Sequence, residues 1–148
     1  MTWRSTKTFG HELGLSIAFR NHHTGSHCQY LHGYALAFEV TFESEQLDVR
    51  GWVMDFGAFG EVLDWLRATF DHRLVVAADD PARATFEALH EAGLCQLTIA
   101  ENGVGCERFA ELVGEWITEW LDLNYTGVRV AQVECREHGA NAGTWVRS

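Results

Sequence analysis

The sequence predicts an α+β fold built on an antiparallel sheet. Strand-like alternation occurs towards both ends of the chain, and helix-like stretches lie between. The expected strands are residues 5–19, 31–43, 94–100, 128–137 and 144–146, and the expected helices are residues 57–70, 81–90 and 106–123. This order, in which strands are followed by helices and then by further strands, is typical of the α+β class. No repeat, low-complexity tract or linker interrupts the chain, so residues 1–148 are expected to form one domain.

The strands are predicted because successive side chains of a strand point to opposite faces of a sheet. Residues 5–19 have this spacing, with a bulge expected near the glycines. Residues 31–43 form the second strand, after a polar, glycine-containing loop at residues 20–26. Residues 128–137 also alternate, although their second face is mixed in character.

The two long helices are predicted from apolar side chains that recur every three or four residues. Residues 57–70 carry one such stripe and residues 106–123 the other. A shorter helix at residues 81–90 is expected because aspartate is a good cap and Pro81 suits a first turn. The expected inward positions are Phe59, Val62, Leu63, Leu66, Phe70, Phe109, Leu112, Val113, Trp116, Ile117 and Trp120.

The charge balance limits the partners. Lys and Arg number 11 against 21 Asp and Glu, a formal net charge of −10, which disfavours nucleic acid and requires local arginines for any phosphorylated substrate. No apolar run approaches the roughly 20 residues of a membrane span, and the first residues lack the apolar core of a signal peptide. The 4 cysteines contain no CxxC pair, as expected for free thiols in a cytoplasmic protein.

The densest chemistry lies in residues 27–34, His-Cys-Gln-Tyr-Leu-His-Gly-Tyr. If Gly33 is extended, His32 and Tyr34 point to the same face of the strand. With Cys28 four residues upstream of His32, this spacing suits a metal-and-base site. The alternative is a cysteine that packs as a small hydrophobe beside a histidine without a role.

Two further candidates adjoin predicted elements. Asp71 and His72 follow the helix at residues 57–70, and a carboxylate can fix a histidine tautomer and raise its basicity. Adjacent residues seldom bond each other, so the two side chains could instead serve different partners, and a histidine at a helix end can also simply interact with the helix dipole. Glu137 ends the strand at residues 128–137, where its carboxylate could accept two N–H groups of a guanidine-like heterocycle or remain a solvated acid.

Together these pieces resemble the 6-pyruvoyl-tetrahydropterin synthase and 6-carboxytetrahydropterin synthase family. The resemblance rests on Phe9-Gly10-His11-Glu12-Leu13, Cys28, His32-Gly33-Tyr34, Met54-Asp55-Phe56, Asp71-His72 and Glu137. It implies the tunnelling fold, in which an antiparallel sheet carries two main helices on one face and protomers join edge to edge. It also implies a homo-oligomer, usually a hexamer, with active sites at the subunit interfaces.

The resemblance further implies a reaction. Family members bind Zn²⁺ through three histidines and act on 7,8-dihydroneopterin triphosphate, whose side-chain hydroxyls the zinc holds as a Lewis acid. Cys28 would then be the thiolate base, and Asp71 and His72 would relay protons or activate the thiol. Glu137 would bind the guanidine-like edge of the pterin.

The expected metal site departs from the family pattern. Tyr34 stands where a third histidine is expected, and a neutral phenol with a pKa of about 10 is a poor zinc ligand. His11 fits the first ligand position only with an enlarged loop, and an ungapped alignment places Phe19 or Arg20 there instead. Three outcomes are open: zinc bound by His11, His27 and His32, weak metal binding with Tyr34, or no metal.

By this resemblance we expect a 6-carboxytetrahydropterin synthase-like lyase in the queuosine-type route to 7-deazapurines. One alternative is a pterin- or purine-binding homologue without synthase activity. Another is a different tunnelling-fold pterin enzyme that uses Cys28, His72 and Glu137 without zinc. The choice between a carboxy- and a pyruvoyl- product stays open.

Overall fold

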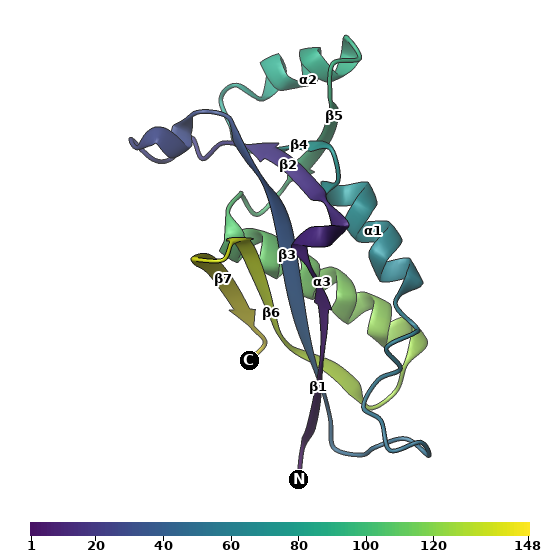
Figure 1. The fold of residues 1–148 in the computed structure, drawn as a ribbon. Coiled ribbons are helices and arrows are strands. Elements are labelled where there is room, and N and C mark those ends of the chain that lie inside the picture. The colour runs from purple at the N-terminus through teal and green to yellow at the C-terminus, as the bar shows by residue number, and fades with distance from the viewer.

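The computed structural model describes residues 1–148 and contains one seven-stranded sheet and three α-helices (Figure 1). The strands lie in the order β5-β4-β2-β3-β6-β7, and β1 pairs with β3 off this path. The strands are β1 (Trp3–Phe9), β2 (Leu15–Phe19), β3 (His32–Ser44), β4 (Arg73–Ala77), β5 (Gln96–Ala100), β6 (Val128–His138) and β7 (Asn141–Val146). The helices are α1 (Gly60–Phe70), α2 (Arg83–Glu91) and α3 (Cys106–Asn124), and two 3-10 turns are η1 (His11–Leu13) and η2 (His27–Gln29).

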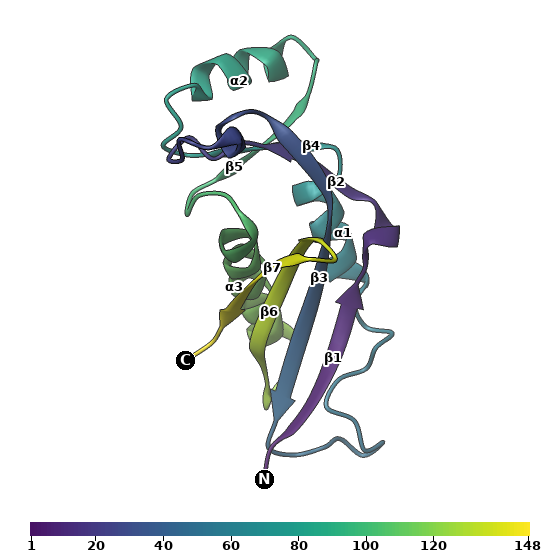
Figure 2. The ribbon, with the colours of Figure 1, turned by 60° about the vertical axis from the view of Figure 1, so that its left-hand side comes forward.

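The long strand β3 organises the sheet because its two halves pair with different neighbours. The first half, from His32 to Leu36, is antiparallel to β2, and the second half pairs with β1 and β6. Figure 2 shows β3 bending between these two parts. Gly33 permits a close approach of the strands, since a Cβ there would collide with the carbonyl oxygen of Ile17 on β2. The segment that contains His32 and Tyr34 is therefore held tightly against β2.

Helices α1 and α3 cover one face of the sheet and enclose the main core (Figure 1). The predicted inward positions are confirmed: eight are buried, and Leu63, Leu112 and Trp116 are half-buried against the same cluster. Trp65 of α1 stacks on Trp116 of α3 with ring centroids 4.6 Å apart, so the two helices contact each other directly. Burial of each large apolar side chain contributes about 1.5–3 kcal/mol.

The sheet is mixed, which corrects the expected antiparallel arrangement. β4 runs parallel to β2, and β5 runs parallel to β4. β4 and β5 can run in the same direction because α2 lies between them and carries the chain back to the end of the sheet where β4 began. The strand predicted at residues 5–19 is in fact two strands, because η1 and Gly14, with a φ of 67°, turn the chain between them. No helix is long and apolar enough to cross a membrane.

The loop after β2 is anchored to the turn after β4. Arg20 donates to both carboxylate oxygens of Asp80, at 2.9 and 2.6 Å, and the Asp80 side chain is only 1% exposed. Asp80 also accepts the backbone N–H of Ala82 at 2.8 Å, just before α2. This contact fixes the start of the loop that leads to Cys28.

Candidate functional site

A cleft of about 410 Å³ lies at the N-terminal end of β3. Cys28, His32 and Glu137, three of the residues predicted for the site, line it together. The rest of the lining consists of Phe19, Asn21, Gly105, Cys106, Glu107, Ala140, Asn141 and Ala142. The cleft therefore lies between the β2–β3 pair on one side and the start of α3 with the β6–β7 turn on the other. Its lining contains carboxylates and thiols but no Lys or Arg.

His32 and Tyr34 lie on the same face of β3, as their spacing predicted. Their ring centroids are 5.6 Å apart, and the rings are nearly perpendicular. Phe19, paired with His32 across the β2–β3 ladder, faces them from β2. Its ring centroid is 4.6 Å from that of His32 and 6.3 Å from that of Tyr34. The structure thus brings three rings together at this position, of which only one is an imidazole.

These three rings have the spacing but not the donor atoms of a three-histidine zinc site. Three imidazoles on one tetrahedral zinc, with Zn–N distances of about 2.0–2.1 Å, have ring centres about 5 Å apart. His32 donates its Nδ1–H to the carbonyl oxygen of Tyr30 at 2.8 Å, which leaves Nε2 as its one available donor to a metal. Phe19 supplies no ligand atom. The residues present therefore do not fit the zinc that the resemblance implies here.

The other predicted metal ligands are not brought to this position. The ring of His11 contacts the carbonyl oxygen of Ala35 at 2.5 Å, near the end of the β2–β3 ladder that is opposite to the Phe19–His32 pair. His27 is exposed on η2. The one group of three metal-binding side chains with converging donor atoms is a different one, His22, His23 and Asp79. His11, His27 and His32 form no such group.

The cleft contains a second thiol that the sequence analysis missed. Cys106 is the first residue of α3, and its neighbour Glu107 also lines the cleft. The pKa of the Cys106 thiol is lowered, chiefly because the buried thiol of Cys135 donates a hydrogen bond to it, an effect that outweighs burial. The sequence signal was available: Cys106 and Glu107 begin a predicted helix directly after a glycine-rich turn, and helix N-termini are places where ligands approach.

Tyr34 remains a neutral phenol. Its pKa is raised, first by burial and then by the nearby Glu137, Cys28 and Cys106, all of which disfavour a phenolate. A neutral phenol is a weak ligand for a divalent metal ion. The electrostatics of the cleft therefore work against the weak metal binding through Tyr34 that the sequence had left open.

Asp71 and His72 bond each other but lie outside the cleft. His72 has a φ of 54°, and its Nδ1–H donates to Asp71 Oδ1 at 2.6 Å. Its backbone N–H donates to the carbonyl oxygen of Ser16 at 2.7 Å, which holds this conformation in place. The His72 side chain is 85% exposed. Within one chain the pair is thus an oriented, solvent-facing imidazole rather than part of the cleft.

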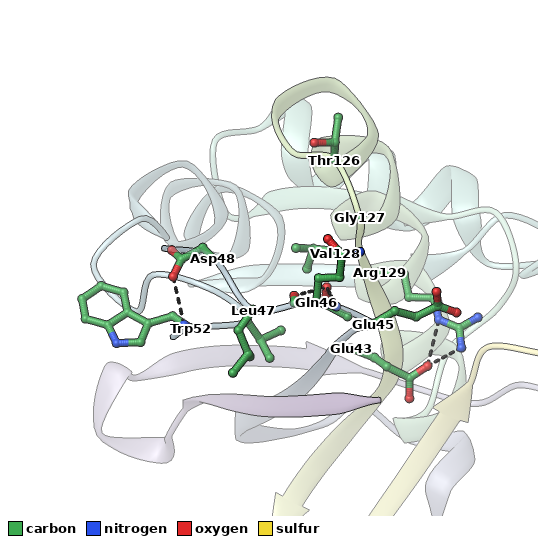
Figure 3. Close-up of a pocket in the computed structure, with 12 residues that line it drawn as sticks. Glu43, Glu45, Gln46, Leu47, Asp48, Trp52, Thr126, Gly127, Val128 and Arg129 are labelled. Atoms are coloured by element: carbon green, nitrogen blue, oxygen red, sulfur yellow. Dashed lines mark hydrogen bonds and ion pairs between the residues drawn. The ribbon is translucent and has the colours of Figure 1, made fainter. Parts of the chain in front are cut away.

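A larger hollow of about 700 Å³ lies at the opposite end of β3 and contains none of the predicted site residues (Figure 3). Glu43, which lines it, pairs with Arg129 of β6 and with Arg4 of β1, at 2.8 Å from the latter. Asp48 accepts the backbone N–H of Trp52 at 2.9 Å and shapes the adjoining turn. Three of the charged residues of this hollow, Glu43, Asp48 and Arg129, thus hold strands and turns together.

Residues 10–147 match the family model described as 6-pyruvoyl tetrahydropterin synthase. The chain belongs to this family. Among similar curated proteins, the 6-carboxy-5,6,7,8-tetrahydropterin synthase of Rickettsia typhi is 39% identical over 54 residues, which are 36% of this chain and 39% of the relative. The protein of the same name from Aquifex aeolicus is 30% identical over 92 residues, 55% of this chain and 57% of the relative. These matches span less than two thirds of the relatives' length.

Solved structures confirm the tunnelling fold. A protein from Wolinella succinogenes described as uncharacterized superposes with a TM-score of 0.84 at 19% identity, covering 100% of this chain and 99% of that one. A 6-pyruvoyltetrahydropterin synthase from Plasmodium vivax superposes with a TM-score of 0.74 at 14% identity and the same coverage. At such low identity the likeness concerns the fold alone.

Proposed function

We propose that the cleft binds a dihydropterin and that Cys28 acts on the pterin side chain as a thiolate base. The observation that supports this most is the convergence of Glu137, Cys28 and His32 on one cleft in a chain of this family. A pterin presents two N–H groups on one planar edge, and a carboxylate can accept both. Phe19 offers an apolar surface beside the site that the heterocycle would occupy.

The proposed reaction is lyase chemistry of the 6-carboxytetrahydropterin synthase type, with 7,8-dihydroneopterin triphosphate as the first substrate to test. Family membership and the names of the matched relatives support it. Cys28 would remove a side-chain proton, and the free Nε2 of His32 would hold a side-chain hydroxyl. Because the lining has no Lys or Arg, the triphosphate would extend out of the cleft.

The Asp71–His72 pair fits this proposal only in an assembly. The pair is preoriented and solvent-facing, so it is available to a neighbouring protomer. In a homo-oligomer joined through sheet edges, such as the hexamer that the resemblance implies, His72 of the partner subunit would complete the cleft next to Cys28. Catalysis would then require the assembled protein.

A second candidate is a pterin- or purine-binding homologue that does not turn its ligand over. Two observations favour it: the ring cluster of Phe19, His32 and Tyr34 offers only one imidazole to a metal, and the cleft lining lacks a Lys or Arg for a triphosphate. Both candidates share ligand recognition by Glu137 and differ in the role of Cys28.

The test measures binding and turnover in the same preparations. Pterin fluorescence reports affinity for 7,8-dihydroneopterin and its triphosphate, and chromatography reports products. Glu137→Gln should weaken binding about 10- to 100-fold, because a hydrogen bond to a charged acceptor is worth about 1.5–3 kcal/mol. Glu134→Gln, on the opposite face of the same strand, is the matched control and should bind normally.

The outcomes separate the candidates. Turnover that is lost in Cys28→Ala while affinity is kept supports the enzyme. Binding without turnover in the wild-type protein supports the binding homologue. Failure of the wild-type protein to bind either of these pterins would refute both the enzyme and the pterin-binding homologue, and only a purine-binding homologue would then remain.

A further inference from the structure

A second cluster of metal-binding side chains lies outside the cleft, where the loop after β2 meets the turn after β4. His22, His23 and Asp79 place one donor atom each within 4.8 Å of one another. His23 Nε2 lies 3.1 Å and His22 Nε2 lies 3.7 Å from Asp79 Oδ2. The two imidazole rings are tilted by 39° with centroids 3.9 Å apart, and each presents its Nε2 to the same carboxylate. Figure 2 shows this loop beside the chain that leads into α2.

His22 has a feature that ion pairing with Asp79 does not explain. Its side chain is only 10% exposed, and its buried Nδ1 has no hydrogen-bond partner. That nitrogen faces Asp80 Oδ2 at 3.9 Å, and Asp80 is held in place by Arg20. A carboxylate behind an imidazole is the usual arrangement around a metal-binding histidine, because it fixes the tautomer and orients the other nitrogen. A small shift of His22 towards Asp80 would satisfy Nδ1 and leave Nε2 directed at an ion.

We propose that His22, His23 and Asp79 bind a divalent first-row transition-metal ion such as zinc. Two imidazoles and one carboxylate are a donor set that suits these ions and leaves coordination positions open for water or an anionic ligand. His23 and Asp79 also line a hollow of about 380 Å³, so the open positions face a space that a small ligand can enter. This site is separate from the position where the resemblance places the family zinc, and it does not depend on the proposed function.

The ion would also couple to the cleft. Asn21, next to His22, lines both the 380 Å³ hollow and the cleft, and its N–H donates to the carbonyl oxygen of Cys28 at 2.9 Å. A metal that clamps His22 and His23 to Asp79 would hold this end of the loop that positions the thiol.

The test is a Co²⁺ titration of tag-free, chelator-stripped protein, read by visible absorption and repeated by competition with Zn²⁺. We expect one saturable site per chain whose affinity falls at least about tenfold in His23→Ala and in Asp79→Asn. Both side chains are largely exposed, at 70% and 65%, so these variants keep the fold. His90→Ala, an exposed histidine on α2, and His32→Ala, at the family position, are controls that should leave this site intact.

Two results would overturn the proposal. One is the absence of saturable Co²⁺ and Zn²⁺ binding by the wild-type protein. The other is a stoichiometric site that His32→Ala removes and that neither His23→Ala nor Asp79→Asn weakens.

Discussion

Replacing Phe19 and Tyr34 with histidine should create a zinc site at the ring cluster around His32. The backbone already places the three rings with centroids 4.6, 5.6 and 6.3 Å apart, close to the roughly 5 Å of three imidazoles on one tetrahedral ion. The double variant Phe19→His/Tyr34→His therefore adds donor atoms to a geometry that is otherwise suitable. His32 Nε2 is free to be the third donor.

The magnitude follows from two opposing terms. Phe19 is 4% exposed and packs edge-on against Phe109 at 5.3 Å, so its replacement should lower the free energy of unfolding of the metal-free protein by about 2 kcal/mol. Structural zinc sites with four ligands contribute about 10–16 kcal/mol, or roughly 3 kcal/mol per ligand. The rings are unequally spaced, so we expect each of the two added ligands to contribute about half of that binding free energy. Together they supply about 3 kcal/mol, which is about 100-fold in zinc affinity.

The assay is urea unfolding with and without zinc, together with a competitive zinc titration, in a His23→Ala background that removes the second metal site. The variant should be less stable than its parent without zinc and should regain stability when zinc is added. Phe19→His alone, with two donors, should gain less than the double variant. A double variant whose zinc affinity rises less than tenfold would show that the ring cluster does not have the spacing of three imidazoles on one tetrahedral zinc ion.

Three further predictions concern Gly33 in β3, the thiol of Cys106 and the carboxylate of Glu43. Gly33→Ala should lower the free energy of unfolding by about 1–3 kcal/mol in urea, because the new Cβ meets the carbonyl oxygen of Ile17. Iodoacetamide should modify Cys106 with a pH midpoint below the ordinary value of about 8.5, since its lowered pKa favours the thiolate, and Cys135→Ala should move that midpoint upward. The pKa of Glu43 is lowered by its two arginines, so its contribution to stability is present at neutral pH and is lost as the pH falls below about 4; Glu43→Gln should flatten this acid dependence in urea unfolding.

Each of these three predictions has a control within the same protein. Gly25→Ala, where nothing lies within 4 Å of the new Cβ, should leave stability unchanged, and an equal loss there would contradict the steric explanation. For the thiol, mass spectrometry follows the peptide that contains Cys106, and an unchanged midpoint in Cys135→Ala would contradict the hydrogen-bond explanation. The exposed Glu45→Gln should retain the full acid dependence; if it flattens the dependence as much as Glu43→Gln does, the arginine pairing is not the cause.

The sequence by itself determined the features that depend on local periodicity. Alternation along a strand placed His32 and Tyr34 on one face, and helical spacing identified the buried sides of α1 and α3. These predictions are correct because side chains repeat every two residues in a strand and every 3.6 residues in an α-helix, independently of the rest of the fold. The ordered motifs also identified the family, since together they extend over most of the chain.

Only the tertiary structure decided which distant residues meet. The β2–β3 register places Phe19 against His32, and the packing of α3 against β6 and β7 brings Cys106 beside Glu137. The parallel edge strands and the meeting of His22 with Asp79, 57 positions later in the chain, likewise follow from strand order and loop anchoring. Such contacts depend on pairing register and side-chain packing across the whole fold, which no local pattern encodes. The sequence therefore determined the family and the faces, and the fold decided the composition of each site.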